Sequence, residues 1–148
     1  MGSEMCIRDR RTGLEMMERN IATILHQDFI RLSPLVTVRE AIDALLKDRA
    51  TEAYVLEKDD SFVGKLSIQE LLLAKPDVPV TEHFQTDIIS IKSDASLQQA
   101  MEVAVNFVGE SIPIIDRESN QMLGIVTEAD LFKDYLTLQN KIVDLERR

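Results

Sequence analysis

A chain of 148 residues, 45% of them hydrophobic and 29% charged, is long and apolar enough for one compact domain or two closely paired half-domains, and it is not a disordered tail. The formal net charge of −9 argues against nonspecific binding of nucleic acid or of an anionic membrane surface. The single cysteine, Cys6, excludes an internal disulfide, and no apolar run approaches the roughly 20 residues of a membrane span, so we expect a cytoplasmic protein without direct membrane insertion.

The first part of the chain predicts a leading helix and then a half-domain. Residues 1–11 show no periodicity and are interpreted as a remnant of cloning or sequence assembly. Residues 12–26 are expected to form an amphipathic helix, because apolar side chains recur at helical spacing. These side chains are Leu14, Met17, Ile21 and Ile24. Within residues 27–75, the pattern predicts a strand at 30–32, a helix led by Val38, strands at 53–56 and 61–66, and a second helix that begins at Ser67.

After a linker at 76–82, the same order of elements returns over residues 83–135. The pattern predicts a strand at 88–91, a helix led by Leu97, strands at 112–115 and 121–126, and a second helix that begins at Thr127. Thr37 and Ser96 stand where N-caps of the first helices are expected. The last helix continues through 136–148. Its apolar stripe, formed by Leu131, Leu138, Ile142 and Leu145, either packs on its own half-domain or contacts another subunit or domain.

The two half-domains are related by an internal duplication. Aligning Asp28 with Asp87 gives an offset of 59 residues, and the same offset pairs Thr37 with Ser96. Glu57 still pairs with Asp116 at the offset of 59, whereas Gly64 pairs with Gly124 at an offset of 60. One residue is therefore inserted in the second copy between these two pairs. A single register kept over this length predicts two copies of one structural unit.

The second copy carries the motif Gly124-x-x-Thr127-x-x-Asp130, after a strand that contains Ile112 and Pro113, and in these residues the sequence resembles the CBS domain family. The first copy has Gly64, Ser67 and Glu70 in the same places, and the likeness spans residues 27–135. The resemblance implies an α/β (α+β) fold. Two pseudo-symmetric repeats, each strand-helix-strand-strand-helix, would pack sheet to sheet as in a Bateman module, with the terminal helices flanking them.

The resemblance also implies two clefts between the repeats that bind adenosine-type ligands. The residues that it places in the first cleft are Asp28, Ile30, Ala50, Thr51, Ile125, Thr127, Ala129 and Asp130. Asp130 would accept hydrogen bonds from a ribose diol, and Thr127 would join backbone amides around a phosphate. The second, degenerate cleft would contain Ser67, Glu70, Thr86 and Ile88, and we expect it to be empty. The candidate ligands are adenosine, AMP, ADP, ATP and S-adenosylmethionine, with no permanent cofactor and no metal.

Two observations favour a simpler interpretation of these motifs. Thr127-x-x-Asp130 and Ser67-x-x-Glu70 are also capping boxes, which satisfy amides at a helix start without any ligand. Glu110 takes the place where phosphate-binding members of the family often have a basic residue, and its charge would repel a phosphate. The two histidines, His26 and His83, fall at unmatched positions and are interpreted as loop or linker residues.

The sequence contains no common catalytic signature, so the function that it favours is regulation rather than catalysis. We expect a module that senses an adenosine-type ligand and controls an attached or partner enzyme, channel or transporter. The resemblance implies that it forms a homodimer. The alternative is a structural dimerisation module whose clefts are vestigial. The ending 130–136 also resembles, less specifically, the cytoplasmic C-terminal part of bacterial ClC-type chloride channels and transporters.

Overall fold

The computed structural model describes residues 20–83, 88–107 and 109–147, and of residues 142–147 it describes the backbone only. The expectations for residues 1–11, for Leu14 and Met17, and for Thr86 therefore lie outside the described residues. The fold is mixed α/β with two three-stranded sheets. This confirms the predicted fold class.

Each repeat contributes one sheet, two α-helices and one short 3-10 helix. The first repeat contains η1 (Ile21–Thr23), β1 (Ile30–Leu32), α2 (Val38–Lys47), β2 (Glu52–Leu56), β3 (Phe62–Ser67) and α3 (Ile68–Leu72). The second contains η2 (Val80–His83), β4 (Ile91–Lys92), α4 (Leu97–Val105), β5 (Ile112–Ile115), β6 (Met122–Val126) and α5 (Glu128–Arg147). In both sheets the first strand is parallel and the third strand antiparallel to the central one.

The strand register confirms the offset that the sequence predicts. Leu32 pairs with Val55 in the first sheet, and Ile91 pairs with Ile114 in the second, so both pairs are displaced by 59 residues. The described strand β4 begins only at Ile91, whereas the sequence predicts a strand at 88–91. Residues 88–90 run beside the sheet without strand pairing, which is a correction to the prediction.

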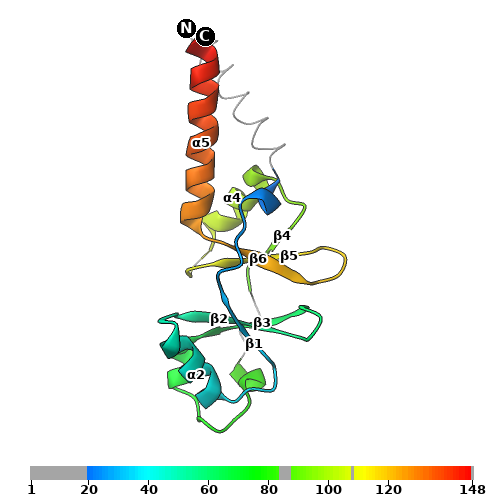
Figure 1. The fold of residues 1–148 in the computed structure, drawn as a ribbon, viewed down its shortest axis with the longest axis vertical. Helices are drawn as coiled ribbons and strands as arrows, with labels where there is room; N and C mark the ends of the chain where they lie inside the picture. Colours follow the sequence, from blue (N-terminus) through cyan, green and yellow to red (C-terminus); the bar gives the residue numbers. More distant parts are fainter. Residues whose placement is uncertain (1–19, 84–87, 108, 148) are drawn as a thin grey trace.

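The two sheets face each other, and the helices cover their outer faces (Figure 1). Behind each sheet lies an aliphatic core, built around Leu45 and Leu66 in the first repeat and around Leu97 and Ile114 in the second. A third cluster of buried side chains lies between the sheets and holds the repeats together. Its buried members are Tyr54, Leu56, Met122 and Ile125. Burial of such apolar surface, at roughly 25 cal/mol per Å², is the main favourable term for joining the repeats.

The hairpins of the two repeats are also joined directly by backbone hydrogen bonds. Phe62 N donates to Asn120 O over 3.0 Å, and Met122 N donates to Asp60 O over 2.9 Å. Asp60 and Asn120 both have positive φ angles, of 68° and 62°, which Asp and Asn tolerate better than most residues. Phe62 is equivalent to Met122, and Asp60 is equivalent to Asn120, so the pseudo-two-fold relation converts one bond into the other. The symmetry of the repeats therefore extends to their turns.

The segments that precede the two repeats are exchanged between them. Ile21 is buried in the core of the second repeat, where its amide donates to Ala95 O, and Val80 is buried in the core of the first. Ile21 and Val80 are 59 residues apart, so they are equivalent positions of the duplication. The described part of the predicted leading helix at 12–26 is therefore corrected: it is a 3-10 turn followed by extended backbone. Residues 76–82, predicted as a linker, contain the start of η2.

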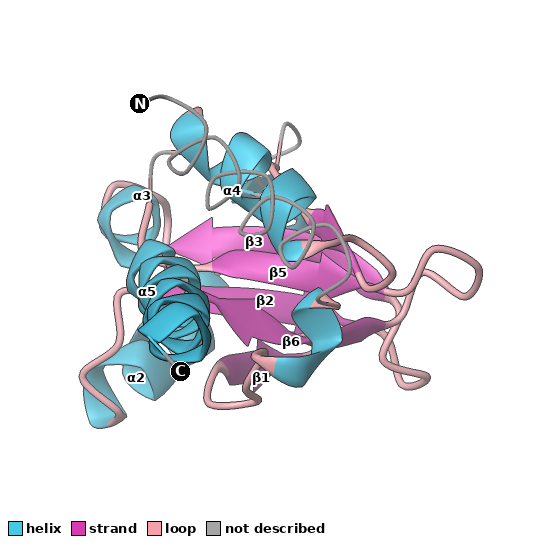
Figure 2. Ribbon diagram, turned by 90° about the horizontal axis from the view of Figure 1, so that it is seen from above, coloured by secondary structure: helices cyan, strands magenta, loops and turns pink. Residues whose placement is uncertain are grey.

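The helix starts agree with the sequence prediction. Thr37 and Ser96 cap α2 and α4, and each closes a full capping box, with Glu40 and Gln99 respectively. In the last helix, α5, Leu131 and Leu138 are buried against the second repeat, so this part of the apolar stripe packs on its own half-domain. The helix runs unbroken beyond the core (Figures 1 and 2).

Candidate ligand site between the repeats

Asp130 lies in the first turn of α5 and closes the capping box predicted from the sequence. Its Oδ2 accepts a hydrogen bond from Thr127 N at 2.9 Å, and its own amide donates to Thr127 Oγ1 at 3.0 Å. Partial burial acts to raise the pKa of Asp130, but the hydrogen bonds from Thr127 and His26 outweigh it and hold the pKa below its ordinary value. Asp130 is therefore an ionised hydrogen-bond acceptor at neutral pH.

His26 is the site residue that sequence reasoning missed. Its Nε2 lies 3.1 Å from Asp130 Oδ2, although the two residues are 104 positions apart. The contact exists because His26 and Ile125 exchange both backbone hydrogen bonds, at 3.0 and 2.8 Å, which adds the leading segment to the edge of β6. His26 was interpreted as a loop residue because its equivalent in the second copy is Gln85. The sequence does not indicate the contact of the His26 imidazole with the Asp130 carboxylate.

The approach of this leading segment depends on Gly124. A Cβ atom built at Gly124 would lie 2.6 Å from Leu25 Cδ1 and 2.7 Å from His26 O. Both separations are too short for a side chain, so the glycine of the motif permits close passage of the backbone that carries His26. The motif glycine therefore positions His26 beside Asp130.

The first-repeat residues of the predicted site lie around the start of β2. Thr51 Oγ1 donates to Glu110 Oε2 at 2.5 Å, so these two residues, one from each repeat, contact across the boundary. Ala50 and Ile30 are half-buried against the core of the first repeat, and Asp28 is exposed. Among the described residues, no hydrogen bond or ion pair joins Thr51 to Asp130. Residues predicted for the first cleft thus take part in two separate polar contacts, that of Asp130 with His26 and that of Thr51 with Glu110.

Two residues predicted in the first cleft have different surroundings. Ile125 is buried between the sheets with Tyr54 and Met122, as a lining residue would be. Ala129 instead lines a groove of about 380 Å³ between α4 and α5, together with Met101 and Phe132. A second cavity, of about 440 Å³, lies beside Arg31 and Pro34. Neither Asp130 nor Thr51 lines either of these two cavities.

The predicted second cleft is built differently from the first. Ser67 is the N-cap of α3, but its side chain makes no capping hydrogen bond, so the prediction of a capping box with Glu70 is wrong on the Ser67 side. The helix that follows is short, Ile68–Leu72, and Glu70 is exposed on it. Ile88 is half-buried outside any strand.

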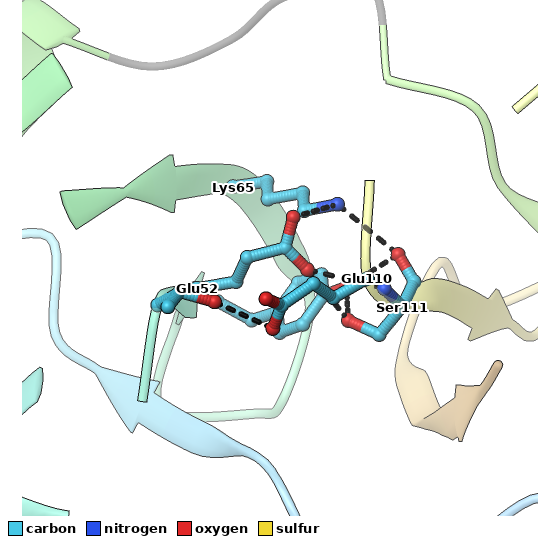
Figure 3. Close-up of polar contacts among 6 residues, drawn as sticks. Glu52, Lys65, Glu110 and Ser111 are labelled. Atoms are coloured by element: carbon cyan, nitrogen blue, oxygen red, sulfur yellow. Dashed lines mark hydrogen bonds and ion pairs between the residues drawn. The ribbon is translucent and has the colours of Figure 1, made fainter. Parts of the chain in front are cut away.

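A buried polar cluster, made of Glu52, Lys65, Tyr54 and Ser111, lies between the repeats (Figure 3). Lys65 Nζ lies 2.9 Å from Glu52 Oε2 and donates to Ser111 O at 3.1 Å. Glu52 Oε1 accepts from both the amide and the hydroxyl of Ser111, at 3.1 and 3.0 Å. The Lys65 side chain is only 5% exposed. An ion pair this deeply buried is costly to separate, so the cluster fixes the position of β5 against β2 and β3.

Aromatic rings complete the surroundings of the ammonium. Lys65 Nζ lies 5.1 Å from the centroid of the Phe107 ring and 5.8 Å from that of Tyr54, both within the range of cation–π attraction. The Tyr54 hydroxyl lies 2.6 Å from Ser111 Oγ, and burial raises the pKa of this phenol above its ordinary value. The sequence signals for the cluster are Lys65, inside the strand predicted at 61–66, and Glu52, directly before the strand predicted at 53–56.

Known proteins share both the sequence pattern and the fold of this chain. The model of the CBS domain family matches residues 80–136, the second repeat. The second repeat is a CBS domain. The two repeats together have the fold of a CBS domain pair, as the sequence predicts, because solved structures of such pairs superpose on the chain.

The curated relatives of this CBS pair are longer proteins. Inosine-5'-monophosphate dehydrogenase of Methanocaldococcus jannaschii is 27% identical over 111 residues, which are 74% of this chain and 22% of the dehydrogenase. The chain thus spans about a fifth of the length of this relative, and the match does not extend to the rest of that enzyme.

Solved structures share the fold of the CBS pair. A CBS domain pair/ACT domain protein of Thermotoga maritima superposes with a TM-score of 0.70 at 19% identity, covering 80% of this chain and 97% of its own. CbpB in complex with c-di-AMP gives 0.77 at 17% identity, with coverages of 94% and 98%. The cytosolic domain of the Mg2+ channel MgtE in complex with ATP gives 0.70 at 19%, with coverages of 86% and 53%. The comparisons do not support the predicted likeness to ClC-type chloride channels.

Two further properties of the described residues bear on the site. No three of their His, Cys, Asp or Glu side chains gather as a metal site would require. None of their helices combines the length and the apolar character needed to cross a lipid bilayer.

Proposed function

We propose that this CBS pair is a regulatory module that binds an adenosine-type ligand between its repeats and controls an attached or partner protein. The proposal is supported by solved CBS structures of the same fold that hold c-di-AMP and ATP, both of which contain adenosine. The repeats of the module are joined along one interface, so a ligand that contacts both would favour one relative arrangement of them. A cytoplasmic partner would respond to that arrangement.

The observation that carries the proposal is that the Asp130 carboxylate is ionised and uses only one of its oxygens, Oδ2, in its hydrogen bonds with Thr127 N and His26. The hydrogen bonds from Thr127 N and from His26 both end on Oδ2, so Oδ1 can accept from a ribose hydroxyl without loss of the helix cap. The low pKa of Asp130 keeps it ionised, and a hydrogen bond to an ionised acceptor contributes about 1.5–3 kcal/mol. Ile125 offers a buried apolar surface beside it.

The contact of Thr51 with Glu110 disfavours a long phosphate chain beside Thr51. Glu110 is bonded to Thr51, and neither residue has a basic side chain as a hydrogen-bond partner among the described residues. Like charges repel most strongly where water is excluded. We therefore propose that adenosine or AMP, rather than ATP, is the preferred class of ligand.

The test is a calorimetric titration with adenosine, AMP, ADP, ATP and S-adenosylmethionine. We expect saturable binding of adenosine or AMP, tighter than that of ATP, and a loss of at least about tenfold in affinity for Asp130→Ala, since 1.4 kcal/mol corresponds to tenfold. Glu40→Ala is the matched control, because Glu40 has the same capping role at α2, and its replacement should weaken only stability, by about 0.5–2 kcal/mol. Equal binding by both variants, or no binding by the folded wild type, would refute the sensor.

A second candidate function is assembly of two copies, favoured by exposed apolar side chains on the helical face of each repeat. Leu46 and Val105 are 59 residues apart and are 59% and 83% exposed, and Leu72 and Phe132 are 60 apart and 61% and 58% exposed. Large exposed apolar side chains at equivalent positions of both repeats are typical of an interface. We propose that a second copy of the chain covers them.

The assembly is tested by changing one residue on each helical face. We expect the double variant Leu72→Glu, Phe132→Glu to sediment as a monomer where the wild type is a dimer, because carboxylates would be desolvated at the contact. Leu35→Glu is the control, since Leu35 is exposed on the loop before α2 and not on a helix, and its variant should remain dimeric. A monomeric wild type at micromolar concentration would contradict the assembly.

A further inference from the structure

The two clefts of the pair differ at three equivalent positions. With the offsets that the strand registers establish, Lys65 in β3 corresponds to Ile125 in β6. On the facing segments, Phe107 corresponds to Asp48 and Gly109 to Ala50. At the first cleft the apolar Ile125 therefore takes the place that Lys65 has at the second. The exposed Asp48 likewise takes the place of the Phe107 ring.

The ring and the ammonium fill this place in the second cleft. A Cβ atom at Gly109 would lie 2.8 Å from the end of the Phe107 ring and 3.3 Å from Glu52 Oε2. An alanine, such as Ala50 at the equivalent position, would not fit there, because the Phe107 ring occupies the space that its Cβ would need. Lys65 Nζ lies under the same ring, at 5.1 Å from its centroid.

The Lys65 ammonium has a hydrogen-bonding or ion-pair partner in each repeat. It has an ion-pair partner in Glu52 at 2.9 Å and a carbonyl acceptor in Ser111 at 3.1 Å (Figure 3). Glu52 belongs to the first repeat and Ser111 to the second, so the ammonium bridges the two repeats as an external ligand is proposed to do at Asp130. A molecule entering here would have to displace it and leave the Glu52 carboxylate without its counter-charge.

We propose that Lys65 is a built-in occupant of the second cleft, so that the chain takes up one adenosine-type ligand, at Asp130, and not two. The number of ligands rests on the proposed function. The occupancy of the second cleft by the lysine does not, because it is a property of the protein alone.

The occupancy is tested by replacing the tethered ammonium with a free one. Lys65→Ala removes the atoms that propylammonium contains, so propylammonium chloride should raise the thermal midpoint of this variant more than equal sodium chloride does. The wild type and Lys65→Met should not respond, since their side chains fill the space. If Lys65→Ala does not fold in sodium chloride, recovery of the folded signal on addition of propylammonium supports the proposal. Equal responses of Lys65→Ala and wild type, or no response of Lys65→Ala, overturn it.

The stoichiometry is tested on the wild type with AMP. One equivalent bound per chain, lost in Asp130→Ala, is expected. Two equivalents would overturn the proposal. If AMP and adenosine do not bind at all, the proposed sensor function fails, while the propylammonium response still decides whether Lys65 occupies the second cleft.

Discussion

Lys65→Met is expected to lower the free energy of unfolding by about 3–5 kcal/mol, the usual cost of removing one partner from a buried ion pair. The Glu52 side chain is 14% exposed, so its carboxylate would stay buried with only the Ser111 hydrogen bonds to stabilise it. Domains of this size unfold with about 5–15 kcal/mol, so the loss would be a large part of the total. Urea unfolding at neutral pH measures it.

The double variant Glu52→Gln, Lys65→Met separates the cost of an unpaired charge from the loss of packing. It removes both charges and keeps an oxygen that can accept from Ser111, so it should be more stable than the single variant and return most of the loss. Lys133→Met, on the exposed face of α5, should change stability by no more than about 0.5 kcal/mol. If the single and double variants were equally unstable, packing rather than charge would explain the effect.

The repeat architecture could be predicted because its signals are local. Helix periodicity, the N-caps Thr37 and Ser96 and the turn residues after Glu57 and Asp116 each act over a few neighbours, and the duplication shows each signal twice. The strand at 88–91 was predicted too long because an apolar run fixes that a segment is buried, not how many of its amides pair.

The contacts between the repeats could not be predicted in the same way. His26 contacts Asp130 across 104 positions of the chain, and Lys65 contacts Ser111 across 46. Both contacts depend on how the sheets are placed, and the sequence shows only an unmatched histidine at the end of the predicted leading segment and a charged residue inside a strand. The pairing of Thr51 with Glu110 likewise turns a residue interpreted as repelling phosphate into a hydrogen-bond partner between the repeats.

Gly124→Ala is expected to destabilise the module by about 1–3 kcal/mol, the usual cost of overpacking a filled interior. Its Cβ would meet Leu25 Cδ1 at 2.6 Å and His26 O at 2.7 Å. The leucine can move by changing its rotamer, but the carbonyl belongs to the backbone that pairs with β6. The extended segment should therefore separate from Ile125, and hydrogen exchange should show loss of protection at the amides of His26 and Ile125.

The double variant Leu25→Ala, Gly124→Ala distinguishes the two contacts. It relieves the side-chain contact and leaves the backbone contact, so the amides of His26 and Ile125 should stay unprotected, while the amides of β2 and β3 serve as the internal control. Because this pairing holds His26 beside Asp130, Gly124→Ala should also weaken any ligand response that depends on Asp130. Unchanged protection at both amides would show that the backbone adjusts to the methyl group, and that the motif glycine does not position His26.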